Sequence, residues 1–362
     1  MTYYWLLLLY ILLVSVAYKN YKKETMAPII LCIIPFFLFF AFRVGFTPDY
    51  YNYENLFEKY HGQSFLDDTA AHELGFQWLC IIMPSYRSIL VLFTSLYCLC
   101  IYTTARFITD KKYLWFAWII LFCYTPFILG NMSGMRSGFV TCFFFLALCI
   151  KIKQRSMFGL LFALLLMVVA YLIHKSVIVL VPLLFVTSKA FGKKVIYLIY
   201  FLAVSFVFVS MFFPNTLNNI GLLLTSALFK DWSYEEYFSG ELESAFSMFS
   251  ILRYVILIYL LYVTISQTQR EKDQLKNLFL KQTVVFYLLV LAPGTIGLIS
   301  RFYYYFAFPC VIGSVVTINN LQKWKRILYI SCVILYAFWQ LYYFYRKGSI
   351  YHYLDYHNIL LQ

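Results

Sequence analysis

Five arginines stand where hydrophobic segments of the chain end, on the side opposite to most of the other cations: Arg43, Arg87, Arg136, Arg253 and Arg301. An arginine at a membrane boundary that breaks the orientation rule is unfavourable to place, and it commonly binds an anion. Because a guanidinium matches two phosphate oxygens at once, we expect the anion to be a lipid-linked pyrophosphate.

One of these arginines lies in a glycine-rich turn between two hydrophobic segments. Gly130–Gly138 contains Arg136 and leads into a predicted helix, whose first N–H groups also attract anions. The alternative is an arginine that merely extends to the membrane interface. We assign stabilisation of a leaving pyrophosphate mainly to Arg136 and Arg301, with Arg43 and Arg253 secondary.

Three other side chains are candidates for proton transfer or for holding an acceptor sugar: Asp49, Glu73 and His174. Each has a plain structural alternative, since short acids favour helix N-termini and a histidine often ends a helix. We rank His174 first as a general base because neutral imidazole accepts a proton at physiological pH. Either carboxylate could instead be the base or position the acceptor.

Aromatic residues make up 22% of the chain. Many belong to an ordinary interfacial belt, but those of the predicted outer loops are denser than a belt requires. Flat aromatic faces stack on sugars, and polar neighbours can bind sugar hydroxyls. The candidate sugar contacts are Tyr53, Asn52, Tyr303, Tyr304 and Lys175.

The elements that must position these residues are membrane helices. The chain has 362 residues, of which 63% are hydrophobic and 12% charged, with a mean hydropathy of +0.75. The sequence predicts an all-α polytopic protein with about twelve transmembrane helices, the first of them uncleaved. They are expected near 3–18, 26–44, 88–108, 114–129, 138–150, 157–173, 177–187, 195–213, 250–266, 279–299, 303–320 and 327–345.

Most lysines and arginines fall in one set of loops and most acids in the other. The positive-inside rule makes the first set cytoplasmic, so both termini are expected outside. Residues 44–87 and 214–250 are then long outer loops of a single membrane domain, 1–362. The cytoplasmic loops are short and lack nucleotide-binding glycine patterns, and the scattered cations exclude a nucleic-acid partner.

Cysteine usage excludes two further classes. The nine cysteines lie almost entirely in apolar runs, and none forms a CxxC pair or a ligand-spaced pair with histidine. They are therefore expected to be small buried side chains, without a disulfide framework or a metal site. No cofactor is expected.

Several of these residues form an ordered set that resembles the EpsG family: Asp49-x-x-Asn52-Tyr53, Glu73-x-Gly75-Phe76, Met135-Arg136, His174-Lys175-Ser176 and Arg301-Phe302-Tyr303. The resemblance covers most of residues 40–310 and extends to Wzy-type polysaccharide polymerases. Two positions depart from it: Thr47-Pro48-Asp49 stands where Gly-x-Asp is common, and Tyr353–Tyr356 lacks a Pro-Tyr pair.

The resemblance implies a C-type glycosyltransferase (GT-C) fold with an active site on the outer face of a bacterial cytoplasmic (inner) membrane. It implies a polymerase of O-antigen, capsule or exopolysaccharide that transfers a glycan from undecaprenyl pyrophosphate to the non-reducing end of another lipid-linked repeat unit. Donor, acceptor and membrane lipid would be its partners, and a chain-length regulator is a further candidate.

Three other functions share part of this pattern. An O-antigen ligase would use the same donor with a lipid A-core acceptor, and a membrane acyltransferase would also use a histidine. A lipid-linked oligosaccharide transporter would need polar groups along a path through the middle of the spans. Most charges of this chain lie at span ends, which disfavours transport.

Overall fold

The computed structural model describes residues 2–17, 26–47, 49–63, 73–108, 110–154, 156–186, 189–213, 248–292, 302–346 and 357–358. Nearly all of these residues are helical, as the sequence predicts. The chain divides into two compact units, which are treated separately below. Unit 1 comprises Met1–Val186 and Ala337–Gln362, and unit 2 comprises Thr187–Tyr336.

Unit 1 contains most of the candidate site residues. Its helices and strands are α1 (Thr2–Ala17), α2 (Ala27–Ala41), β1 (Arg43–Val44), α3 (Tyr50–Tyr60), α4 (Leu74–Ile82), α5 (Tyr86–Phe107), η1 (Lys111–Tyr113), α6 (Leu114–Trp118), η2 (Ile119–Cys123), η3 (Pro126–Gly130), α7 (Asn131–Ser133), α8 (Met135–Lys153), α9 (Met157–Ile173), η4 (Lys175–Leu180), α10 (Val181–Leu184) and β2 (His357–Asn358).

Unit 2 consists of helices alone among its described residues. They are α11 (Lys193–Phe212), α13 (Met248–Arg270), α14 (Gln274–Leu291), η6 (Tyr303–Phe306), α16 (Ala307–Asn320) and the first part of α17 (Lys323–Arg346). The helix α14 packs against both α13 and α16. It begins at Gln274, earlier than the span expected from 279.

The apolar helices agree with a polytopic membrane protein. Among the described residues, four helices are long and apolar enough to cross a bilayer: Tyr86–Phe107, Met135–Lys153, Lys193–Phe212 and Ile251–Arg270. A fifth candidate is the pair Leu114–Cys123 and Pro126–Ser133, which is bent by 59°. Shorter apolar helices add to these, and the count of about twelve stays a prediction.

One expected span takes another form. Residues 177–187 were expected to cross the membrane, but the chain there forms a 3₁₀ helix, Lys175–Leu180, followed by the single turn of α10. Such a segment is too short to cross a hydrocarbon core of about 30 Å. This segment therefore does not form a full span by itself.

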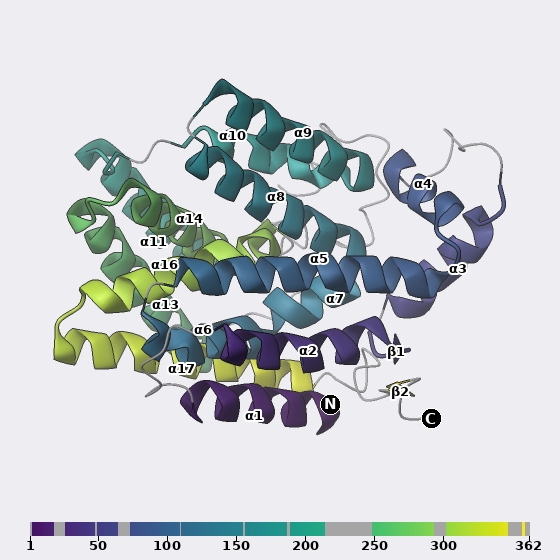
Figure 1. The fold of residues 1–362 in the computed structure, drawn as a ribbon. Helices are drawn as coiled ribbons and strands as arrows, with labels where there is room; N and C mark the ends of the chain where they lie inside the picture. Colours follow the sequence, from purple (N-terminus) through teal and green to yellow (C-terminus); the bar gives the residue numbers. More distant parts are fainter. Residues whose placement is uncertain are drawn as a thin grey trace. The chain divides into compact units, whose positions relative to one another are not determined.

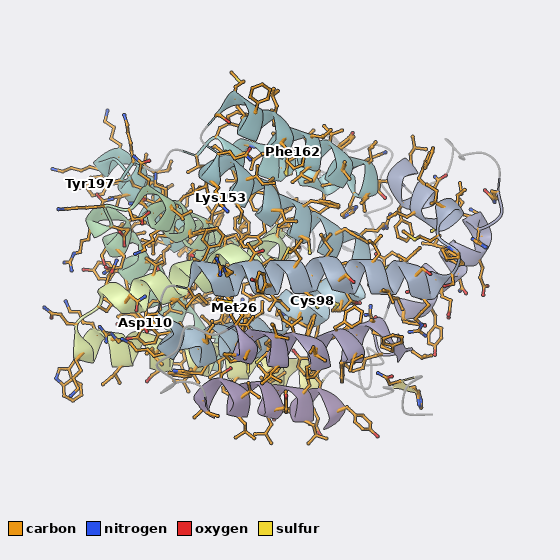
Figure 2. All side chains as sticks on the ribbon, viewed as in Figure 1. Met26, Cys98, Asp110, Lys153, Phe162 and Tyr197 are labelled. Atoms are coloured by element: carbon orange, nitrogen blue, oxygen red, sulfur yellow. The ribbon has the colours of Figure 1, made fainter. Side chains whose placement is uncertain are left out.

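The helices of unit 1 bring the described residues of the predicted first outer loop to one end. Figure 1 shows α3, α4 and the β1–β2 pair at the end where α2 finishes and α5 begins. Strand β1 pairs antiparallel with β2, with Arg43 opposite Asn358. Figure 2 labels Asp110 and Lys153 towards the other end of the same unit. The loops predicted to face opposite sides of the membrane thus lie at opposite ends of unit 1.

Candidate functional site

The centre of the site is a cluster of three side chains from separate parts of unit 1, called the Glu73 cluster below: Glu73, Arg136 and His174. One carboxylate oxygen of Glu73, Oε2, pairs with Nη1 of Arg136. The other, Oε1, lies 2.8 Å from Nδ1 of His174 and accepts the backbone N–H of Lys175 at 3.3 Å. One carboxylate thus joins the candidate phosphate ligand to the candidate base.

Three helix ends meet to form this cluster. Glu73 is the residue before α4, His174 the residue after α9, and Arg136 lies in the first turn of α8. The carboxylate of Glu73 makes no capping bond to its own helix. The structural alternative from the sequence, a plain helix cap, is therefore not the use that the chain makes of this side chain.

A glycine allows α4 and α9 to approach closely enough. A Cβ placed on Gly75 would lie 2.6 Å from the backbone carbonyl carbon and oxygen of Leu172. No side chain fits such a gap without moving one of the two helices. Because Gly75 and Leu172 each lie two positions from a cluster residue, this contact sets the distance between Glu73 and His174.

Arg136 is held between two aromatic rings. Its guanidinium carbon lies 5.9 Å from the ring centroids of Tyr53 and of Phe76, and these two rings contact each other edge to face. A cation over such faces is stabilised by the ring quadrupoles. The Arg136 side chain is 20% exposed, so part of it is accessible to an anion.

A second carboxylate lies beside the cluster. Asp49 is the residue before α3, makes no capping bond to that helix, and accepts a hydrogen bond from Ser133 Oγ at 2.9 Å. Tyr53 lies one helical turn after Asp49, and the charges of both Arg136 and Asp49 act on its hydroxyl. Tyr53 therefore connects the Asp49–Ser133 pair to the Glu73 cluster.

Helix α3 is amphipathic, which explains how it presents these residues. Its buried side chains are Tyr50, Tyr53, Phe57 and Tyr60, with the spacing of one face of an α-helix. Tyr50 and Phe57 both contact the ring of Tyr86, at the start of α5. This aromatic face fixes α3 on the body of unit 1.

Hydrogen bonds between neutral polar groups stabilise the turn before Arg136. Asn131 donates to Phe127 O at 2.8 Å and accepts from the hydroxyl of Thr141 at 2.9 Å. The hydroxyl of Tyr97 also donates to Phe127 O. In the same region a Cβ on Gly138 would overlap the ring of Phe93. Gly138 is therefore explained by helix packing, without a need for close approach of a ligand.

Within unit 1, two of the five arginines bind backbone carbonyls. Arg43 is 1% exposed and donates to Phe40 O at 2.7 Å and to Met132 O at 2.9 Å. Arg87 donates to Ala41 O at 3.1 Å and to Arg43 O at 2.8 Å. They bind carbonyls at the end of α2 and in the turn before Arg136, so we leave them out of the phosphate site proposed below.

The remaining predicted residues are placed as follows. Asn52 and Lys175 are exposed beside the cluster in unit 1. Arg253, Tyr303 and Tyr304 belong to unit 2, where Arg253 donates to Val290 O at 3.3 Å and the two tyrosine rings are in contact. Arg301 lies outside the described residues, as does most of the second outer loop.

Electrostatics keep Glu73 ionised. Burial alone would raise the pKa of this carboxyl, but the hydrogen bond from His174 and the charge of Arg136 outweigh it and lower the pKa to about 2. Burial also raises the pKa of Tyr53, against the opposing charge of Arg136. The cluster therefore contains a carboxylate and a guanidinium that are both charged at neutral pH.

The ionised carboxylate determines which nitrogen of His174 carries hydrogen. A carboxylate only accepts hydrogen bonds, so the neutral imidazole must donate from Nδ1 and keep its lone pair on Nε2. In the part of the chain that the structure describes, Nε2 has no hydrogen-bond partner, and the side chain is 9% exposed. Chemically, this is a base held by a carboxylate next to a site for an anion.

Sequence reasoning did not single out Ser133, Phe76 or Gly75 for these roles. All three stand inside the motifs that were weighed, but their contacts are to residues far away in the chain: Asp49, Arg136 and Leu172. The one available signal was the conjunction of Gly75 and Phe76 with Glu73.

Fold and site together define a polytopic helical membrane protein with a cluster of one carboxylate, one guanidinium and one imidazole at helix ends. The model of the EpsG family matches residues 26–358, nearly the whole chain. This chain belongs to the EpsG family, which confirms the predicted resemblance and supports a role in polysaccharide biosynthesis. No curated protein and no solved structure matches the chain.

Proposed function

We propose that this protein is a polysaccharide polymerase of the bacterial cytoplasmic membrane. It transfers a glycan from undecaprenyl pyrophosphate to the non-reducing end of a second lipid-linked repeat unit, on the outer face of the membrane. The observation that carries the proposal is the Glu73 cluster, in which an anion ligand and a base share one carboxylate. Membership of the EpsG family supports a role in polysaccharide biosynthesis.

Arg136 binds the pyrophosphate of the donor. Its guanidinium is partly exposed, and it lies in the first turn of α8, where backbone N–H groups add to the attraction for an anion. Negative charge grows on the pyrophosphate as the glycosidic bond breaks. A preorganised guanidinium stabilises that charge, and removing one such group typically lowers the rate by about 100- to 1,000-fold.

His174 is the base for the acceptor. The proton of the acceptor hydroxyl passes to Nε2, and the oxygen forms a bond to the anomeric carbon of the donor. The bond from that carbon to the pyrophosphate breaks, and its electron pair leaves with undecaprenyl pyrophosphate. Glu73, hydrogen-bonded to Nδ1 of His174, stabilises the imidazolium that results.

Asp49 and Tyr53 are placed to position the acceptor sugar. One oxygen of Asp49 accepts a hydrogen bond from Ser133, and the charges of both Asp49 and Arg136 act on the hydroxyl of Tyr53. The exposed side chains of Asn52 and Lys175 extend this surface. Arg253, Arg301, Tyr303 and Tyr304 stay predictions from the sequence, as do the GT-C fold, the external termini and a chain-length regulator.

The proposal is tested by deleting the gene in a host that makes the matching repeat unit and measuring glycan length after complementation. We expect the deletion to reduce the ladder to a single repeat unit, and the wild-type gene, but not Arg136→Ala or His174→Ala, to restore it. A ladder that survives the deletion overturns the function. If repeat units still polymerise on the carrier lipid but fail to reach lipid A-core, the protein is a ligase.

A further inference from the structure

The carboxylate of Glu73 contacts two side chains of the site at the same time. Its two oxygens are used separately, Oε2 for the guanidinium of Arg136 and Oε1 for the imidazole of His174. Both partners are mostly buried, with side-chain exposures of 20% and 9%. A change of charge at one partner is therefore transmitted through a single buried carboxylate to the other.

In the structure, Arg136 partly neutralises Glu73. A carboxylate paired with a guanidinium stabilises a neighbouring imidazolium less than a free carboxylate does, since the two charges act on His174 with opposite sign. A pyrophosphate bound to Arg136 adds negative charge on the far side of the guanidinium and offsets its effect. The imidazolium of His174 is then stabilised by a carboxylate that is less fully neutralised.

The other charged groups near His174 do not reverse the stabilisation of its imidazolium by bound pyrophosphate. The helix α9 packs against α8, α4 and η4. Among the described residues, the charged groups that these elements bring to His174 are Arg136, Glu73 and Lys175, and the Lys175 side chain is exposed and screened by water. Asp49 acts on the hydroxyl of Tyr53 of α3, and the Tyr53 ring lies against Arg136.

We propose that Glu73 couples the two halves of the site, so that pyrophosphate bound to Arg136 makes His174 a stronger base. This inference rests on the proposed function, and it makes Glu73 a positioning residue. The acceptor hydroxyl is then activated fully only when a donor occupies the site. Without a donor, His174 is the weaker base and activates neither water nor acceptor.

The test is the pH at which His174 becomes half protonated, measured by NMR on the full-length protein in nanodiscs with labelled histidine. The chain has five histidines, and His174→Asn assigns the signal. Saturating inorganic pyrophosphate is the probe. In the wild type we expect it to shift this midpoint upward by roughly one pH unit.

Two variants separate coupling from simple proximity. In Arg136→Ala the midpoint should already be higher without ligand, and pyrophosphate should not move it further. In Glu73→Gln it should be lower and insensitive to pyrophosphate, whereas Asn277→Ala in unit 2 should respond as the wild type does. A Glu73→Gln protein that responds like the wild type overturns the coupling.

The outcomes also separate this inference from the proposed function. If pyrophosphate binds and the midpoint stays constant while the glycan ladder still requires Arg136 and His174, coupling fails and the polymerase stands. If pyrophosphate does not bind to the wild type, both the coupling and the phosphate role of Arg136 are overturned. A polymer made without this protein overturns the function regardless of the NMR result.

Discussion

The two units differ in where their polar side chains lie and in what these side chains bind. In unit 1 the Glu73 cluster places two opposite charges and an imidazole at helix ends. In unit 2 a cluster of hydroxyls, Thr264, Tyr287 and Tyr329, lies in the middle of packed helices. Tyr329 OH lies 3.2 Å from Tyr287 OH and 3.5 Å from Thr264 Oγ1, and Thr264 also donates to Leu260 O.

The hydroxyl cluster of unit 2 is a means of packing. Thr264, Tyr287 and Tyr329 are between 0% and 3% exposed, and their groups are neutral, so each bond satisfies a group that would otherwise be buried without a partner. The Glu73 cluster keeps more exposure and an ionised carboxylate, and one imidazole nitrogen has its lone pair available. This difference supports the proposal that unit 1 carries the chemistry, whereas these hydroxyls stabilise the packing of unit 2 itself.

The largest expected effect is that of Arg136→Ala on activity. Loss of the guanidinium should lower the rate of glycan transfer about 1,000-fold because leaving-group charge is no longer stabilised. Arg136→Lys should recover only part of the wild-type rate of glycan transfer, since an ammonium does not bind two phosphate oxygens side by side. Single-turnover transfer from a lipid-linked donor measures both, and a wild-type rate in Arg136→Ala would remove this residue from the site.

The next effect is that of His174→Ala. Loss of the base should lower the rate about 100-fold and leave donor binding unchanged. The dependence of kcat on pH checks the role, since the variant should lose the acidic limb that the wild type shows. An unchanged pH profile would assign the acidic limb to another group.

Glu73 should make the stability of unit 1 depend on pH in the acid range. Its pKa is lowered to about 2 from an ordinary value of 4.5, so the stabilisation is complete above 4.5 and is lost as the pH falls towards 2. At ~1.4 kcal/mol per pKa unit the loss amounts to a few kcal/mol. Denaturant unfolding in detergent measures it, and Glu73→Gln should flatten the dependence over this range.

Gly75→Ala sharpens the comparison by moving Glu73 without changing its chemistry. The added Cβ would overlap the backbone of Leu172, so α4 must shift away from α9. We expect a loss of stability of about 1–3 kcal/mol, together with an activity loss that exceeds the fall in folded protein. If activity follows the folded fraction alone, the distance between Glu73 and His174 does not matter for catalysis.

The smallest effect should come from unit 2. Asn277 donates to Thr268 O at 2.7 Å and to Glu271 O at 3.1 Å, which satisfies carbonyls at the end of α13. Asn277→Ala should lower the free energy of unfolding by about 1 kcal/mol per lost bond, with glycan transfer per folded molecule unchanged. A loss of glycan transfer per folded molecule would contradict the assignment of the chemistry to unit 1 alone.

The sequence predicts the residue types of the site but not their pairings. Arg136, Glu73 and His174 each stand at the end of an apolar segment, and that position is readable from hydropathy. Their contact depends on the approach of α4 to α9 at Gly75, a long-range packing fact that no local pattern encodes. For this reason the sequence left Glu73 open as a cap, a base or a sugar ligand.

Arg43 and the bent pair of helices show the same limit. At the sequence level Arg43 and Arg136 both follow an apolar segment, yet only the structure distinguishes an arginine bound to backbone carbonyls from one beside an ionised carboxylate. The sequence predicts one span at residues 114–129, whereas the structure has two helices there, Leu114–Cys123 and Pro126–Ser133, bent by 59°. The bend lies at residues 124–125, directly before Pro126 and between two π-helical turns, Ile119–Cys123 and Pro126–Gly130.

The most direct test of the central claim is transfer by the purified full-length protein in nanodiscs, with lipid-linked repeat units extracted from cells that make them. The account predicts that the wild type and Asn277→Ala lengthen the lipid-linked glycan and release undecaprenyl pyrophosphate. Arg136→Ala should do both about 1,000-fold more slowly and His174→Ala about 100-fold more slowly, although both variants remain folded. Elongation by these two variants at the wild-type rate would contradict the assignment of the Glu73 cluster as the active site.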